Sequence, residues 1–223
     1  MNRRGHTTEH HISVRRTARF VTMGAPGERI REVWFVCHGY GELVSTFIRG
    51  LTRLDAENRL IVAPEALGRF YLDPEHDKVG ASWMTREDRL NEIRDYLDYL
   101  DAVHGEIFSW IARDSVRVIV LGFSQGTATA ARWACRGTVR AARLILWGES
   151  LPPELEDEES LQRLRSMQLT LVAGNRDHFF TDQHRGELRE RLKRLDLPFE
   201  ELTFDGGHRL DDQTLADIAA RNS

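Results

Sequence analysis

Short runs of apolar, largely β-branched residues alternate along this chain with segments of helical spacing. The apolar runs are continuous, which indicates strands buried on both faces, as in a parallel sheet covered by helices. Six such strands are expected, at residues 33–37, 60–63, 116–122, 144–147, 169–173 and 199–204. Residues 12–23 alternate more and are expected to add one or two edge strands. The pattern predicts an α/β fold with a mostly parallel central sheet and helices on both faces.

The clearest helix is expected between the second and third of these strands. Apolar residues spaced three and four apart form one stripe that also contains His104, which we expect at the edge of the core; the apolar members are Leu90, Ile93, Leu97, Leu100, Ile107 and Ile111. Further helices are expected at 44–54, 125–136, 160–166, 181–195 and 211–220. The acidic stretch 154–159 is interpreted as a solvated helix start, with a lid or a docking site as the alternative.

Length and composition narrow the class of protein. The 223 residues are expected to form one domain, 1–223, of which the polar residues 1–11 form a flexible tail. A net charge of −4 gives no reason to expect a nucleic-acid partner. Cys37 and Cys135 are too few for a disulfide framework, and neither a targeting segment nor an integral membrane segment is recognised. The expected location is therefore the cytoplasm.

A Gly-x-Ser-x-Gly pattern, Gly122-Phe123-Ser124-Gln125-Gly126, follows the expected strand 116–122 and precedes a helix. This strand–turn–helix context is the one in which such a serine acts as a nucleophile. The glycines are expected because side chains there would collide with the neighbouring strand or helix. Ser124 is the candidate nucleophile, and a plain tight turn is the alternative interpretation.

A serine nucleophile needs a base and an acid, which follow it in the order acid, then histidine. His208 comes directly after the last strand and two glycines, whereas His178 and His184 lie in a charged helical region. Asp177 ends a buried strand that opens into a glycine-bearing turn, and it is the predicted acid. Glu149, after the preceding strand, and Asp205 remain alternatives.

The loop after the first buried strand reads His38-Gly39-Tyr40-Gly41. Backbone N–H groups of Tyr40 and of Gln125, the residue after the nucleophile, are the predicted oxyanion hole. His38 precedes the serine and is expected to brace this loop by hydrogen bonding. Cys37 is expected to be a buried thiol, with a reactive cysteine as the alternative.

Residues 68–84 form a long, aromatic connection that is expected to lack secondary structure, which is typical of functional loops. We predict that Phe70, Tyr71, Trp83 and Met84 help to line an acyl pocket. The alternative is that they only cover the edge of the sheet.

Together these motifs resemble those of the bacterial phospholipase/carboxylesterase group, the esterases similar to acyl-protein thioesterases. The resemblance runs from residue 33 to 208, and its matching pieces are residues 38–41, 64–66, 82–83, 122–126, 174–177 and 206–208. It implies an α/β-hydrolase fold without a large cap domain, and a hydrolase without metal or cofactor that cleaves carboxylic esters through an acyl-enzyme.

The same resemblance allows a thioesterase or lysophospholipase with the same catalytic residues. A non-catalytic binding module is a further alternative, although the chain retains candidates for every catalytic part. The expected partner is a small-molecule ester or thioester. Thr127, Glu149 and the run His178-Phe179-Phe180 depart from the group's pattern around the site, so the substrate is less determined than the reaction.

Overall fold

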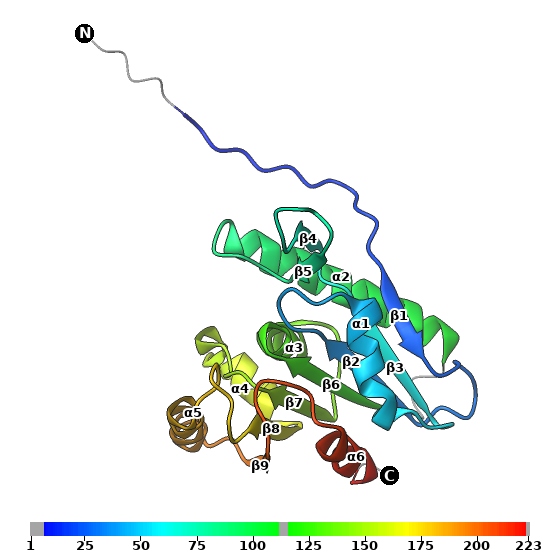
Figure 1. Ribbon diagram of the computed structural model, residues 1–223, viewed down its shortest axis with the longest axis vertical. Helices are drawn as coiled ribbons and strands as arrows, with labels where there is room; N and C mark the ends of the chain where they lie inside the picture. The colour runs from blue at the N-terminus through cyan, green and yellow to red at the C-terminus, as the bar shows by residue number, and fades with distance from the viewer. Residues whose placement is uncertain (1–6, 112–115, 222–223) are drawn as a thin grey trace.

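The computed structural model describes residues 7–111 and 116–221, and its centre is a seven-stranded sheet in the order β1-β3-β2-β6-β7-β8-β9 (Figure 1). β1 is antiparallel to β3, and all other neighbours are parallel. The strands are β1 Phe20–Met23, β2 Glu32–Cys37, β3 Arg59–Pro64, β6 Arg117–Phe123, β7 Arg143–Trp147, β8 Gln168–Gly174 and β9 Phe199–Phe204. The predicted mostly parallel α/β fold is confirmed, with each of the six expected strands within one residue of its expected bounds, although β9 is a half-buried edge strand.

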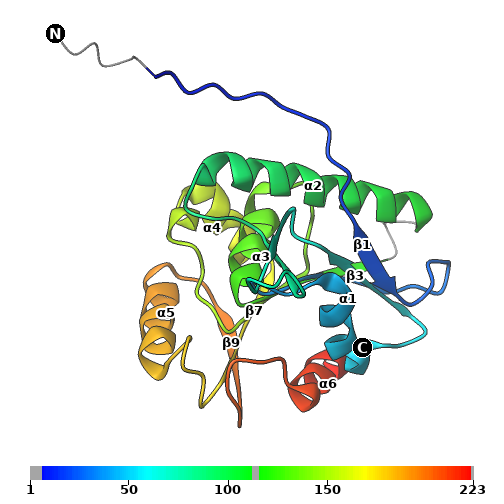
Figure 2. The same ribbon diagram turned by 45° about the horizontal axis from the view of Figure 1, so that its top comes forward.

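Helices cover both faces of the sheet (Figure 2). One face packs against α2 Arg89–Trp110, α3 Gln125–Arg136, α4 Glu158–Arg165 and α5 Asp182–Arg194. The other packs against α1 Val44–Phe47, the 3-10 helix η1 Ile48–Leu54 and α6 Asp212–Ala220. Because strand side chains alternate between faces, Phe35 of β2 enters the first core and Trp34 enters the second. A further 3-10 turn, η3 Pro153–Leu155, follows β7.

Several sequence expectations need correction. Residues 7–19 contain no strand, and only Phe20–Met23 joins the sheet edge. The helix expected at 44–54 is a four-residue α-helix followed by a 3-10 helix. Leu90 is 71% exposed, because α2 begins at residue 89 and its buried face starts at Ile93, where Tyr96 and Val103 join the apolar stripe. Of the expected tail, residues 7–11 are exposed without helix or strand, and residues 1–6 lie outside the described residues.

The connection 68–84 is not a loop without secondary structure. It contains an antiparallel hairpin of β4 Gly68–Tyr71 and β5 Val79–Ser82, whose strands pair with each other and not with the main sheet. Its sequence carries no run of buried β-branched residues, and its partner strand is only seven residues away along the chain. The hairpin packs on the loop after β2, where Glu42 forms a bridge to Ala81.

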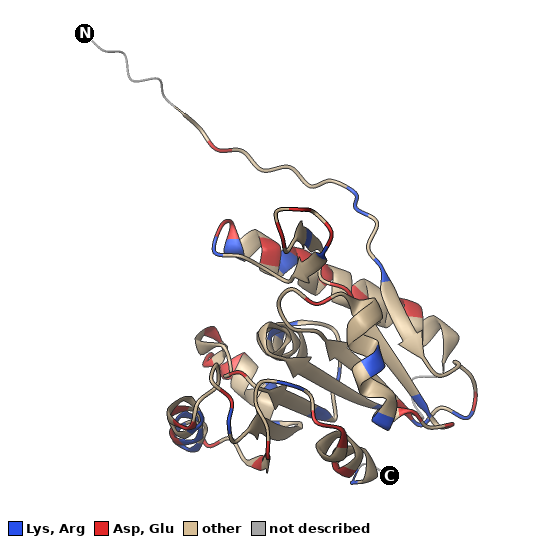
Figure 3. Ribbon diagram, viewed as in Figure 1, with Lys and Arg blue, Asp and Glu red and all other residues tan. Residues whose placement is uncertain are grey.

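The charges are mixed over the whole ribbon, with Lys and Arg interspersed among Asp and Glu (Figure 3). No helix within residues 7–111 and 116–221 is long and apolar enough to cross a membrane. In the same residues, no group of three or more histidine, cysteine or acidic side chains is arranged to hold a metal ion.

Candidate active site

Ser124 lies in the tight turn between β6 and α3, with backbone angles of φ 52° and ψ −125°. Such a positive φ is uncommon for a residue with a side chain, and it is typical of a serine held in a sharp strand-to-helix turn. A Cβ at Gly122 would lie 2.3 Å from the Gly126 carbonyl oxygen, and one at Gly126 would lie 2.2 Å from the Cys37 carbonyl oxygen. Both positions therefore exclude any side chain, which explains the Gly-x-Ser-x-Gly pattern.

Thr127, where the resembled group commonly has glycine, fits this turn for a specific reason. Its side chain is fully buried, and its hydroxyl lies 2.8 Å from the Gly122 carbonyl oxygen and 3.1 Å from that of Trp147. The Ser124 N–H donates to the same Trp147 oxygen at 2.8 Å. Thr127 thus ties the turn to the end of β7 and does not face the substrate side.

His208 and Asp177 are brought together by two neighbouring loops at the carboxyl ends of β8 and β9. His208 Nδ1 lies 2.7 Å from Asp177 Oδ2, while Asp177 Oδ1 accepts the Phe179 and Phe180 N–H groups, each at 2.9 Å. The two loops are joined through Gly206, whose carbonyl accepts the Arg176 N–H at 2.8 Å. Both carboxylate oxygens of Asp177 are therefore held by hydrogen bonds, and the carboxylate orients the imidazole through its Nδ1.

The imidazole of His208 sits beside the nucleophile turn. Its ring centroid lies 5.0 Å from that of Phe123, the residue before Ser124, and 5.0 Å from that of Phe179. A Cβ built on Gly148 would lie 3.0 Å from His208 Cε1, so this glycine is what allows the close approach. Within the described residues, the Ser124 hydroxyl makes no hydrogen bond. Hydrogen bonds between a nucleophile and its base are often long or poorly aligned in the absence of substrate.

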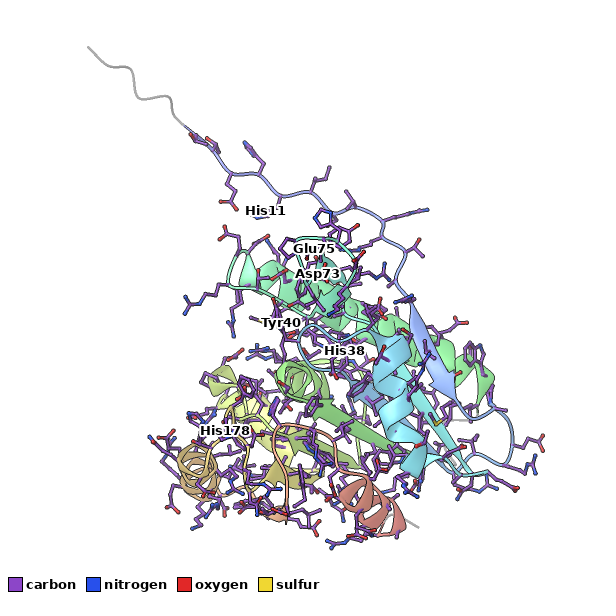
Figure 4. All side chains as sticks on the ribbon, in the orientation of Figure 1. His11, His38, Tyr40, Asp73, Glu75 and His178 are labelled. Carbon is purple, nitrogen blue, oxygen red and sulfur yellow. The ribbon has the colours of Figure 1, made fainter. Side chains whose placement is uncertain are left out.

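The alternatives for base and acid lie elsewhere. Glu149 is exposed, and its carboxylate accepts the N–H of Ser150 at 2.7 Å instead of contacting His208. Asp205 is also exposed and faces Arg176 at 3.3 Å. His184 caps the start of α5, and His178 is exposed on the α5 side of the molecule (Figure 4).

The predicted oxyanion loop runs from β2 to α1, and its side chains His38 and Tyr40 are marked in Figure 4. Within the described residues, the Tyr40 N–H has no hydrogen-bond acceptor, and Gln125 is the first residue of α3, where N–H groups have no partner within the helix. The Tyr40 ring is 61% exposed and stacks on Phe70 with 5.1 Å between centroids. Two backbone donors are therefore left without a partner, that of Gln125 next to Ser124 and that of Tyr40 in the loop after β2.

His38 braces this loop as expected. It is fully buried, its Nδ1 lies 2.7 Å from the Gly39 carbonyl oxygen, and its Nε2 accepts the Ala66 N–H at 3.0 Å. That pattern requires a neutral ring protonated on Nδ1, and burial accordingly lowers the pKa of His38, partly offset by the Gly39 carbonyl. Cys37 next to it is also fully buried, and burial raises the pKa of its thiol, which makes it a poor nucleophile.

Two side chains support the site in ways that the motifs do not indicate. Glu42 accepts the Gly39 N–H at 2.7 Å, and burial raises its pKa despite that hydrogen bond and the nearby His208. The Gln125 side chain binds the end of the hairpin, accepting the Trp83 N–H at 3.0 Å and donating to the Met84 carbonyl at 2.9 Å. The only sequence hint for Glu42 is that it directly follows the oxyanion loop.

A cavity of about 450 Å³ opens beside Ser124. Its wall combines α3, the segment after β7 and α5, and the lining residues are Met84, Ser124, Gln125, Ala128, Arg132, Glu149, Ser150, Leu151, Pro152, Pro153 and Arg191. A second hollow, at residues 24–30 and 55–57, lies at the amino ends of the parallel strands, far from the serine. The cavity beside Ser124 is therefore the candidate substrate pocket.

Of the four residues predicted for the acyl pocket, only Met84 lines this cavity. Trp83 is buried beneath the loop after β2 and donates its indole N–H to the His38 carbonyl at 2.9 Å. Phe70 and Tyr71 belong to β4, where Phe70 stacks on Tyr40 and Tyr71 on His76. These three do not line the cavity because the segment folds into a hairpin against the loop after β2, so their part in an acyl pocket stays a prediction.

The acidic stretch 154–159 is a helix start only in part. Asp157 caps α4 by accepting the Ser160 N–H at 3.0 Å, as expected. Glu154 instead faces Arg132 and Arg89, each at 2.7 Å. Burial would raise the pKa of Glu154, but its own backbone N–H and the two guanidinium groups outweigh it and lower the pKa to about 2.

No protein-family model matches the sequence, and no curated protein matches it. Solved structures do match the fold. Acyl-protein thioesterase 2 of Zea mays superposes with a TM-score of 0.69 at 18% identity, over 92% of this chain and 98% of that one. Esterase PE8 gives 0.68 at 18% identity, over 92% and 97%. A phospholipase/carboxylesterase of Dyadobacter fermentans gives 0.63 at 17% identity, over 92% and 97%. This likeness shows that the chain has the α/β-hydrolase fold, with no large cap domain.

Proposed function

We propose that this protein is a serine hydrolase that cleaves carboxylic esters through a Ser124–His208–Asp177 triad. The observation that carries the proposal is the 2.7 Å contact between His208 Nδ1 and Asp177 Oδ2. The same imidazole packs on the ring of Phe123, which directly precedes Ser124 in its positive-φ turn. The fold shared with esterases and an acyl-protein thioesterase supports the same class of reaction. The unpaired N–H groups of Gln125, next to the serine, and of Tyr40, in the loop after β2, would supply the remaining element that acyl transfer needs.

The proposed reaction has two halves. Ser124 Oγ attacks the ester carbonyl carbon while His208 Nε2 takes the hydroxyl proton. Asp177 holds the Nδ1–H and stabilises the imidazolium. The carbonyl oxygen becomes an oxyanion that accepts the N–H groups of Tyr40 and Gln125. When the intermediate collapses, the carbon–oxygen bond of the leaving alcohol breaks and His208 returns the proton to it. Water then attacks the acyl-enzyme by the same route and releases the acid.

A fluorophosphonate probe tests this proposal directly, because it labels a serine only where a base and an oxyanion hole activate it. We expect labelling of the wild type and hydrolysis of p-nitrophenyl butyrate, and loss of both in Ser124→Ala. No labelling of the wild type, or equal labelling of the Ser124→Ala variant, would overturn the proposal.

The acid is tested by a matched pair of variants. Asp177→Asn is expected to lower kcat by about 10⁴-fold, since the amide cannot hold the imidazole in the required tautomer. Glu149→Gln is expected to stay within about tenfold of wild type, because Glu149 contacts Ser150 and not His208. A larger loss in Glu149→Gln than in Asp177→Asn would assign the acid to Glu149.

A further inference from the structure

The cavity beside Ser124 is lined by a buried arginine, Arg132. Arg132 is 4% exposed. It lies on the same face of α3 as Ala128 and the preceding Ser124, because the three residues are spaced four apart, and all three line the cavity. A pocket for a plain hydrocarbon chain would have an apolar side chain at this position. Burial of a guanidinium is costly unless its N–H groups are paired, so the partners of Arg132 indicate what the pocket binds.

Only part of the guanidinium is paired within the protein. Arg132 Nε donates to Glu154 at 2.7 Å, and Nη1 donates to the Tyr96 hydroxyl at 3.2 Å and lies 3.7 Å from the Met84 sulfur. Arginine has five N–H donors, two of them on Nη2. In the described part of the chain Nη2 makes no hydrogen bond, yet it is not closed off from solvent, and Arg132 lines the cavity. Two donors of a buried cation are thus free to meet a bound molecule.

The charges around the cavity leave a positive excess. Glu154 pairs with Arg132 and Arg89, Glu156 pairs with Arg191 and Arg194, and the cavity adds its own Glu149. Four arginines therefore face three carboxylates. Arg191 is committed to the wall, since its Nη2 donates to the Pro152 carbonyl at 2.9 Å. The available cationic edge is that of Arg132.

We propose that Arg132 binds a carboxylate carried by the substrate, so that the enzyme prefers half-esters of dicarboxylic acids over neutral esters of equal length. This inference rests on the proposed function. Ser124 and Arg132 are eight residues apart, about 12 Å along the helix axis, and helical side chains lean toward the N-terminus, which shortens the gap. An acyl chain of roughly four to six carbons spans that gap. Charge-assisted pairing then selects for an anion at its far end.

The test compares phenyl hydrogen adipate with phenyl hexanoate, which share a six-carbon acyl chain and differ in the terminal carboxylate. In wild type, kcat/KM is expected to be higher for the adipate ester. Arg132→Met preserves bulk and removes the donors, and it is expected to lower the adipate-to-hexanoate ratio by about tenfold or more. Glu154→Gln removes the competing anion and is expected to raise the ratio. Arg136→Met, one turn further along α3 and outside the cavity, is the control and should leave the ratio unchanged.

Other outcomes are distinguishable. Both esters could be hydrolysed in a Ser124-dependent way while neither Arg132→Met nor Glu154→Gln changes the adipate-to-hexanoate ratio of kcat/KM. In that case the carboxylate inference is wrong while the proposed function stands. If instead the butyrate ester of 4-hydroxybenzoate, compared with phenyl butyrate, is the pair that responds to Arg132→Met, the carboxylate is carried by the alcohol and the acyl assignment is wrong.

Binding provides a measurement that does not need turnover. In Ser124→Ala, calorimetric titration with phenyl hydrogen adipate is expected to show binding that Arg132→Met weakens by about tenfold or more. Equal affinity in the presence and absence of Arg132, or no binding at all, would contradict the proposal.

Discussion

Gly148 controls the position of His208, and Gly148→Ala is the most informative single change. The residue has φ +72°, where a side chain costs about 1–2 kcal/mol. The new Cβ would lie 3.0 Å from His208 Cε1 and 3.2 Å from Nδ1, so the ring must move by a few tenths of an ångström. The Phe123 and Phe179 rings lie against the same imidazole, which leaves few directions for that movement.

The free energy of unfolding is therefore expected to fall by about 1–2 kcal/mol, which lowers Tm by roughly 2–8 °C in a chain of this size. A misplaced base also weakens proton transfer, and we expect kcat/KM to fall by about ten- to hundredfold. Hydrolysis of p-nitrophenyl butyrate and calorimetric melting measure the two effects. Wild-type kcat/KM in a folded Gly148→Ala variant would refute the role given to His208.

Gly105 supplies the matched control for this glycine-to-alanine change. It lies in α2, exposed, and a Cβ there meets nothing within 4 Å. Gly105→Ala is expected to stabilise the helix by about 0.5–1 kcal/mol without altering kcat/KM. Stability changes of opposite sign in the two variants would separate backbone strain from a general effect of added methyl groups.

Three further changes probe the supports of the site. Burial raises the pKa of Glu42, so ionisation of its carboxyl costs the folded wild type stability as pH rises from 4 to 8, whereas the glutamine variant has no such cost. Glu42→Gln should therefore gain stability relative to wild type over this range; urea unfolding at both pH values measures this, and an equal difference at each contradicts it. The Glu65 carboxylate is fully buried and accepts hydrogen bonds from Arg19 at 2.6 Å, Arg69 at 2.6 Å and the Val44 N–H at 3.1 Å. Glu65→Ala should therefore lower the free energy of unfolding by about 2–3 kcal/mol in the same assay. A loss under about 1 kcal/mol would refute a stabilising role for these contacts. Thr127→Val removes a buried hydroxyl and should cost about 1 kcal/mol with less than a tenfold change in kcat/KM; an unchanged Tm would show that its hydrogen bonds contribute nothing.

The sequence predicts the main sheet well because five of its strands, β2, β3, β6, β7 and β8, carry continuous apolar runs, whose burial on both faces needs no knowledge of the partners. The expectation of full burial was wrong for β9, which is a half-buried strand at the edge of the sheet. The sequence fails to predict the β4–β5 hairpin because that segment has no continuous apolar run, and because contacts with the distant loop after β2 add to its local pairing. The Gly41 N–H donates to the Ala81 carbonyl at 2.9 Å, and Gly80 lies directly against the Gly41 backbone. Leu90 shows the same limit, since its apolar character fits the stripe although α2 meets the core only from Ile93 onward.

Catalytic and substrate-binding residues differ in how far the sequence can indicate them. Ser124 and the predicted oxyanion loop sit in short patterns whose glycines are required by contacts that the structure gives in ångströms. Apart from Ser124 and Gln125, the residues that line the cavity belong to no such sequence pattern. Arg132 could be picked out only as the residue eight positions after the serine on one helix face, and its partners Tyr96 and Glu154 come from two other segments. The proposed acyl-transfer chemistry would fix the first set, whereas the second is free to change with each substrate. An arginine that lines the cavity would therefore say more about the substrate of this protein than the proposed triad does.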